Sequence, residues 1–305
     1  MKNNIINFGE YVDYNEEKRI ISYLAERYDF LNITEIGKSI LGRSIPMLTL
    51  GEGDKSVLYI AAHHGMEWIT SAILLRFVNE YCEFLKNGKT VYQTSLPFLF
   101  TSRTIHIVPM LNPDGVEYSI HGVGKDHVLY DRLIKMNGGS DDFSFWQANA
   151  RGVDINHNYN AGFEEYKRLE SKLNIFDGAP TKYSGEYPES EPESNAICRF
   201  VRIKEISAVL TLHSQGEEIY YTSGDTEAKN SLAVGKIISR LTDYKLSRPD
   251  GTAAYGGFTD WFIREFGKPS FTIECGKGRN PLPFSDFPAI YSNLRQMLFT
   301  FPTLI

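Results

Sequence analysis

The chain has 305 residues, of which 42% are hydrophobic and 23% charged, and this composition excludes a disordered, collagen-like or coiled-coil protein. The 32 Lys and Arg residues against 38 Asp and Glu residues give a formal charge of −6, so no nucleic-acid partner is expected. No apolar run approaches the roughly 20 residues of a membrane span, so no membrane partner is expected either. Cys82, Cys198 and Cys275 lack the spacing of a disulfide framework or a thiolate metal site. With no apolar leader at the N-terminus, a cytoplasmic protein is predicted.

The first third of the chain alternates between helix and strand patterns. Apolar side chains recur at helical spacing over 16–30, and the alternating runs 32–40 and 44–53, joined by Leu41-Gly42-Arg43, predict a β-hairpin. The continuous apolar run 56–62 is typical of a buried strand. A long helix over 67–86 and another strand over 103–109 follow.

The middle of the chain, 110–190, is rich in Gly, Asn, Asp and Tyr and has little periodicity, which predicts functional loops. Regular patterns then return. They predict helices over 191–204, 225–241, 257–266 and 286–299, and strands over 208–213 and 270–275. Strands alternating with helices indicate an α/β sheet covered on both faces. Because no linker is visible, residues 1–305 are predicted to form one catalytic domain, with 1–30 as a helical lead-in.

The strongest local signal is the segment AAHHGMEW, in which His64 and Glu67 are three residues apart. Both lie where a strand ends and a helix begins, the edge at which open α/β sheets form ligand sites. An imidazole and a carboxylate from one turn can bind a single zinc ion. Alone, H-x-x-E is a weak motif, and a Glu stabilised in a first helical turn is the more frequent explanation of it. The adjacent His63 is a competing ligand on spacing alone.

Two further residues stand at the ends of apolar strands. His213 closes the run AVLTLH and could complete a set of two His and one Glu, which leaves a fourth zinc position open. Glu274 lies within SFTIEC, where an unpaired carboxylate is costly. A carboxylate beside an open metal position can take a proton from water and pass it to a leaving amine. A buried structural His and a salt-bridged strand-end Glu are the simpler alternatives.

The segment NARGVDINHNYN carries more polar side chains than a plain strand would. Arg151, Asn156 and His157 could bind a substrate carboxylate, although a network of Asx turns explains the same residues equally well. In LNPDGVEY, the Pro-Asp-Gly composition favours a structural turn.

Taken together, the segments resemble the zinc carboxypeptidase family. The resemblance rests on H-x-x-E, N-P-D-G, G-V-D-x-N-x-N, L-x-L-H-S, G-G-x-x-D-W and the strand Glu, in that order over 34–276. It implies an α/β fold with a mixed, roughly eight-stranded twisted sheet and helices on both faces. It also implies one zinc ion per chain bound by His64, Glu67 and His213, with Glu274 as the general base.

The pattern departs from the family where a substrate carboxylate would bind. His157 stands at the position of the arginine that holds a C-terminal carboxylate, and Thr252 at that of the covering tyrosine. The arginine that polarises the scissile carbonyl falls near Gln147, with Arg151 close by. Gln147, Arg151, Asn156 and His157 are therefore the candidate substrate-binding residues. A histidine cannot form the bidentate contact of a guanidinium, so ordinary trimming of protein C-termini is not favoured.

Within the family, segments 137–154, 211–221 and 256–283 are most similar to the bacterial γ-D-glutamyl-meso-diaminopimelate peptidase I branch. This resemblance implies a small peptide substrate derived from peptidoglycan, cut between D-glutamate and a diamino acid. The alternatives are an ordinary metallocarboxypeptidase and a zinc deacylase similar to aspartoacylase and succinylglutamate desuccinylase. A zinc-holding binding module without catalysis is disfavoured by the intact Glu274. The sequence makes no prediction about oligomeric state.

Overall fold

A computed structural model describes residues 8–305, which build one mixed sheet of eight strands. In spatial order the strands run β1-β2-β6-β3-β7-β12-β8-β11. Their bounds are β1 (Asn32–Lys38), β2 (Ser44–Leu50), β3 (Lys55–Ala61), β6 (Arg103–Val108), β7 (Ile206–His213), β8 (Glu218–Tyr220), β11 (Lys245–Ser247) and β12 (Ser270–Glu274). The four central strands β6, β3, β7 and β12 are parallel, whereas β1 and β2 form the antiparallel hairpin that the sequence predicts.

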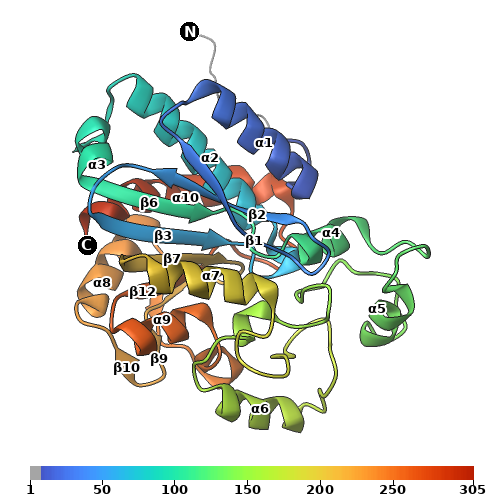
Figure 1. Ribbon diagram of the computed structural model, residues 1–305. Coiled ribbons are helices and arrows are strands. Elements are labelled where there is room, and N and C mark those ends of the chain that lie inside the picture. The colour runs from blue at the N-terminus through green and yellow to red at the C-terminus, as the bar shows by residue number, and fades with distance from the viewer. Residues whose placement is uncertain (1–7) are drawn as a thin grey trace.

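Helices cover both faces of this sheet, as Figure 1 shows. One face packs against α1 (Tyr14–Arg27), α2 (Ile69–Lys86), α3 (Leu96–Ser102), α8 (Ser231–Thr242) and α10 (Phe287–Thr300). The other packs against α7 (Pro192–Ile203) and α9 (Phe258–Phe266). The predicted fold class, an eight-stranded mixed α/β sheet between two helical layers, is confirmed.

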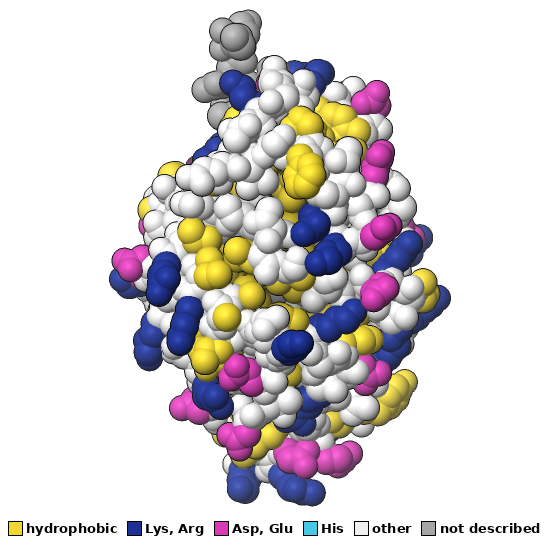
Figure 2. Space-filling model, turned by 90° about the vertical axis from the view of Figure 1, so that its left-hand side faces the viewer, with side chains coloured by type: hydrophobic (Ala, Val, Ile, Leu, Met, Phe, Trp, Pro, Cys, Tyr) yellow, Lys and Arg dark blue, Asp and Glu magenta, His cyan; other side chains and the backbone are white. Residues whose placement is uncertain are grey.

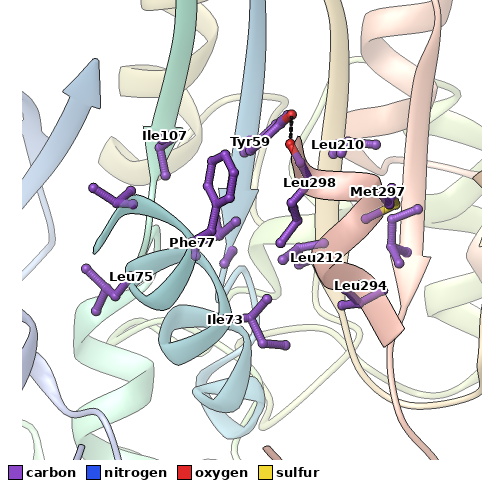
Figure 3. Close-up of a cluster of buried hydrophobic side chains, with 14 of the residues drawn as sticks. Tyr59, Ile73, Leu75, Phe77, Ile107, Leu210, Leu212, Leu294, Met297 and Leu298 are labelled. Carbon is purple, nitrogen blue, oxygen red and sulfur yellow. Dashed lines mark hydrogen bonds between the residues drawn. The ribbon is translucent and has the colours of Figure 1, made fainter. Parts of the chain in front are cut away.

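The central position of β3 in the sheet explains why residues 57–61 are all apolar. Val57 and Tyr59 point into the cluster formed with α2 and α10, whereas Leu58 and Ile60 point into the cluster formed with α7 and α9. Because both faces are covered, both sets of side chains are buried. In the first cluster, drawn in Figure 3, the Tyr59 hydroxyl donates to the carbonyl of Leu298 on α10 at 2.9 Å. This bond satisfies the polar end of a fully buried ring.

The middle segment corrects two predictions. Residues 110–190 are not all loop, since they contain α4 (Pro113–His121), α5 (Tyr130–Met136) and α6 (Phe163–Lys172). The N-P-D-G segment is not a free turn but the start of α4. Asn112 caps this helix by accepting the N–H of Gly115 at 3.0 Å, and Pro113 occupies its first turn, where a missing N–H costs nothing. Short polar helices have too little apolar periodicity to be found by pattern.

Smaller elements also escape the sequence analysis. They are the pairs β4 (Thr90–Val91) with β5 (Thr94–Ser95) and β9 (Thr222–Ser223) with β10 (Thr226–Glu227), besides β8 and β11 of the main sheet. The helix predicted over 225–241 begins only at Ser231, because β10 occupies its first residues. Part of the predicted lead-in, residues 1–7, lies outside the described residues.

The surface carries charges of both signs. On the face that Figure 2 shows, Lys and Arg side chains are interspersed with Asp and Glu side chains, so this face lacks the single-sign basic field that nonspecific nucleic-acid binding uses. Among residues 8–305, no helix combines the length and the apolar character needed to traverse a bilayer.

Candidate active site

Three neighbouring parallel strands bring the predicted residues to one edge of the sheet. His64 follows β3, His213 ends β7 and Glu274 ends β12. β7 pairs with β3 on one side and with β12 on the other, and Glu274 lies directly beside His213 in the register of the ladder. The carboxyl ends of these strands therefore place an imidazole and a carboxylate side by side.

The turn after β3 is held against the start of α4 by close backbone packing. It contains the short 3-10 helix η1 (Gly65–Glu67), and a Cβ on Gly65 would lie 2.3 Å from the carbonyl oxygen of Gly115. The N–H groups of Gly65 and Met66 donate to the carbonyls of Gln147 and Trp146, both at 2.9 Å. The turn is thus fixed between the N-P-D-G segment and the loop that contains Gln147.

Four donor atoms from His64, Glu67 and His213 converge in a buried cluster. His64 Nδ1 lies 3.0 Å from Glu67 Oε1, and His213 Nδ1 lies 3.0 Å from Glu67 Oε2. The two Nδ1 atoms are 3.4 Å apart. Within residues 8–305, these three side chains form one of two groups whose ligand atoms all lie within 4.8 Å of one another, and all three are buried.

This cluster fits a zinc ion. Two ring nitrogens facing each other over one carboxylate present lone pairs that a cation can accept, and N and O donors of this kind are typical zinc ligands. Although burial alone would raise it, the neighbouring imidazoles of His64 and His213 lower the pKa of Glu67 to about 2. The carboxylate is therefore ionised at neutral pH, which is the form that binds metal.

Polar groups behind the cluster orient it. Asp154 Oδ1 lies 3.2 Å from Nε2 of His64, and a contact of this kind usually orients a metal-bound histidine. Asn280 Nδ2 donates to Glu67 Oε1 at 3.4 Å and also to the carbonyl of Ser214. His63 is buried with its Nε2 3.1 Å from the Tyr159 hydroxyl, and it does not belong to the converging group.

Glu274 lines the same cavity as His64, and its carboxylate is half-buried at the end of β12. Burial, reinforced by the nearby Glu67 carboxylate, raises the pKa of Glu274 to about 8. A raised pKa makes a carboxylate a stronger proton acceptor when it is ionised and a better donor when it is protonated.

The cavity beside the cluster encloses about 200 Å³ and receives three of the four candidate substrate-binding residues: Gln147, Asn156 and His157. Asn156 Oδ1 accepts the N–H of Phe258 at 3.1 Å, so its amide NH₂ remains as a donor. Arg151 is not brought to this cavity. It lines a separate one and lies 3.5 Å from Glu191. Thr252 is at the main cavity, as the alignment with the family's covering tyrosine implies.

Two residues of the site carry no recognisable signal in the sequence. Asn280, behind Glu67, is a single amide in a Gly- and Pro-rich loop and belongs to no local pattern. Lys182 lines the cavity from a loop between α6 and α7. A lone lysine in an irregular segment gives no periodic or motif signal, and only the fold brings it near His157.

A model of the zinc carboxypeptidase family matches residues 18–296. The chain therefore belongs to the zinc carboxypeptidases, which are metallopeptidases and hydrolases. Among curated proteins, γ-D-glutamyl-L-diamino acid endopeptidase 1 of Lysinibacillus sphaericus is 37% identical over 288 residues, covering 94% of this chain and 71% of the relative. Human carboxypeptidase B2 is 29% identical over 294 residues, covering 88% of this chain and 63% of the relative.

Solved structures share the fold. Bovine thrombin-activatable fibrinolysis inhibitor, in complex with tick carboxypeptidase inhibitor, superposes with a TM-score of 0.70 at 23% identity, covering 96% of this chain and 95% of that chain. The murein-tripeptide amidase MpaA of Escherichia coli O157 superposes with a TM-score of 0.55 at 20% identity, covering 90% of this chain and 91% of that chain. At these identities the likeness concerns the fold alone.

Proposed function

We propose that the protein is a zinc-dependent peptidase that binds one zinc ion per chain through His64, Glu67 and His213. The observation that carries this proposal is the convergence of their donor atoms at the cavity that Glu274 also lines. Zinc held by two imidazoles and one carboxylate supplies a Lewis acid with an open position.

Glu274 is the proton carrier in this proposal. Its carboxylate takes a proton from the attacking water and later delivers it to the leaving nitrogen. The raised pKa suits both roles, and no hydrogen bond within residues 8–305 ties the carboxylate to a neighbouring side chain. Gln147 lines the cavity, and its backbone carbonyl accepts the N–H of Gly65. We assign its side-chain amide as the donor to the carbonyl oxygen of the scissile bond.

The substrate that we propose is a small peptide containing a γ-D-glutamyl–diamino acid bond, as in peptidoglycan. Support comes from the γ-D-glutamyl-L-diamino acid endopeptidase 1 of Lysinibacillus sphaericus, which is 37% identical to this chain. It also comes from His157 and Thr252, which replace the arginine and tyrosine that hold an ordinary C-terminal carboxylate in the family. The three cysteines are unpaired and buried, which supports a reducing compartment such as the cytoplasm.

The test is a digest followed by mass spectrometry. L-Ala-γ-D-Glu-meso-diaminopimelate is incubated beside a panel of plain C-terminal peptides and a benzoylated dipeptide. We expect free diaminopimelate from the first, loss of this activity on chelation and recovery with zinc. A higher kcat/KM for the benzoylated dipeptide would instead establish an ordinary metallocarboxypeptidase, and release of a free acyl acid from N-acyl amino acids would indicate the deacylase.

A further inference from the structure

The cavity beside Glu274 has an uneven distribution of charge. Its lining includes three carboxylates, those of Asp154, Asp260 and Glu274, but Lys182 is the single Lys or Arg among the described residues that line it. Asp154 is engaged by His64, and Glu274 faces the metal-binding cluster. Apart from the proposed zinc ion, a substrate carboxylate entering this cavity therefore has one cationic side chain to meet, that of Lys182.

His157, which occupies the position of the family's carboxylate-binding arginine, cannot take that role here. Its ring stacks on Tyr166 with centroids 4.0 Å apart, and its Nδ1 lies 3.0 Å from the carbonyl of Tyr255. Because a carbonyl only accepts, Nδ1 carries the proton. Burial lowers the pKa of His157 although the Asp154 carboxylate and the bond to Tyr255 oppose the shift, and the charges of His64 and Lys182 add to the lowering. The ring is then neutral, and its remaining nitrogen presents a lone pair rather than an N–H.

Lys182 is fixed by its backbone and free at its ammonium group. Its N–H donates to Asp154 Oδ2 at 2.9 Å, and its carbonyl accepts from the Tyr166 hydroxyl at 3.2 Å. Its φ of +66° is unusual for a residue with a side chain. The side chain is half-buried, and among residues 8–305 its Nζ forms no ion pair with a carboxylate. A cation held near the metal-binding cluster without an ionic partner is available to a ligand.

Resting on the proposed function, we propose that Lys182 binds the α-carboxylate of the amino acid whose nitrogen is released, with the amide NH₂ of Asn156 as a second donor. The backbone of Lys182 is two contacts away from His64, through Asp154. Because Lys182 lies this close to the metal-binding cluster, it suits the carboxylate on the carbon next to the scissile nitrogen. The carboxylate at the far end of a long diamino acid would lie farther from the cluster. A lysine ammonium and an amide contact this carboxylate without the bidentate fork of the family's arginine, so a plain C-terminal carboxylate is still held less firmly than in the ordinary carboxypeptidases.

The experiment compares two substrates that differ in one charge. One is L-Ala-γ-D-Glu-meso-diaminopimelate, and the other is the same peptide with only the α-carboxyl next to the scissile bond converted to a carboxamide. In the wild type we expect kcat/KM for the acid to exceed that for the amide by about tenfold or more, as a charge-assisted hydrogen bond implies. Lys182→Met should abolish this preference by lowering the acid's kcat/KM, mainly through KM, while leaving the amide's nearly unchanged.

Two variants control the comparison. Lys182→Arg keeps the positive charge and should restore most of the preference. Lys172→Met removes an exposed lysine at the end of α6 and should leave it unchanged. A positive φ of +66° strains any residue with a side chain to a similar extent. The Lys182→Met and Lys182→Arg variants should therefore fold equally well, and their thermal unfolding midpoints check this. If the ratio of kcat/KM for the acid to kcat/KM for the amide is the same in Lys182→Met as in the wild type, the proposal is overturned.

The outcome separates this proposal from the proposed function. If the wild type cleaves another peptide instead, the same acid and amide pair is made on that peptide, and the ratio decides the role of Lys182. If it cleaves none, the proposed function has failed. The role of Lys182 is then tested by measuring the binding of free meso-diaminopimelate to the zinc-loaded protein by calorimetry. Weaker binding by about tenfold in Lys182→Met supports the carboxylate contact, and equal binding overturns it.

Discussion

Asp154 contacts both the metal-binding cluster and the substrate cavity: its Oδ1 lies 3.2 Å from Nε2 of His64, while its Oδ2 accepts the N–H of Lys182. It is buried, and the neighbouring imidazoles of His64 and His157 outweigh burial and hold its pKa well below the usual range. An ionised carboxylate behind a ligand histidine fixes the ring's tautomer and leaves the other nitrogen for the metal.

Asp154→Asn is therefore expected to weaken zinc binding by about 10–100-fold, the usual effect of removing such a carboxylate. Competition with a fluorescent zinc chelator measures the affinity. Asp142→Asn, at an exposed carboxylate, is the control. Unchanged affinity in Asp154→Asn would mean that His64 does not bind metal through its Nδ1.

Glu274→Gln should retain zinc but lose activity by about 10²–10⁴-fold, since the amide keeps the shape of the side chain but cannot accept a proton. Zinc content by mass spectrometry and kcat/KM on the same preparation separate the two effects. His213→Ala should lose both metal and activity. Loss of zinc from Glu274→Gln would make Glu274 a ligand or a structural group.

Gly65→Ala should reduce stability and metal binding together. Its Cβ would lie 2.3 Å from the Gly115 carbonyl oxygen and 2.8 Å from that of Trp146, so backbone must move on the turn that carries His64 and Glu67. A cost of about 1–3 kcal/mol in unfolding free energy is expected for such overpacking. Gly9→Ala, where a Cβ would meet nothing within 4 Å, is the matched control for urea denaturation. Equal midpoints for the two variants would contradict the packing argument.

Glu193 should make stability depend on pH. It is buried on α7 near the carboxylates of Asp114 and Glu191, and burial raises its pKa to about 8 despite a hydrogen bond from Asn149 at 3.2 Å. Between its ordinary pKa near 4.5 and about 8, the folded protein holds a proton that the unfolded chain releases. The contribution of Glu193 to the unfolding free energy therefore falls as pH rises through this window.

Glu193→Gln, which mimics the protonated acid, should remove this dependence. Relative to the wild type, the variant should gain about 1–4 kcal/mol in unfolding free energy between pH 5 and pH 8. Chemical denaturation at both pH values measures the change, and Glu186→Gln, at an exposed carboxylate, should run parallel to the wild type. A Glu193→Gln curve that also runs parallel would show that the carboxyl is ionised throughout.

The sequence predicts those parts of the site that follow from strands. His64 follows one apolar strand, and His213 and Glu274 end two others. Since parallel strands end at one edge, the pattern favours their convergence, and the family resemblance implies their roles. Arg151 shows the limit of this reasoning. It is close to Gln147 in sequence, but the loop turns at Gly152, with φ +77°, and Arg151 faces a different cavity.

The remaining parts depend on tertiary contacts between irregular segments. N-P-D-G has a turn's composition, but in the structure its Asn caps a helix that packs against Gly65. Lys182 and Asn280 come from loops more than 100 residues away from His64, and neither belongs to a repeating pattern. Three-residue strands such as β8 are too short to alternate visibly, although their pairing with β12 helps to place Glu274.

The in-register pairing of Glu274 with His213 also determines how the protein should lose function on partial unfolding. β7 and β12 lie inside the sheet, and the amides of their ladder should exchange with solvent only when the whole domain opens. The loop of Lys182 is anchored by a few hydrogen bonds and should open at lower free energy. Under mild destabilisation, selectivity among substrates should therefore decline before the chemical step does, and hydrogen exchange should register the two events separately.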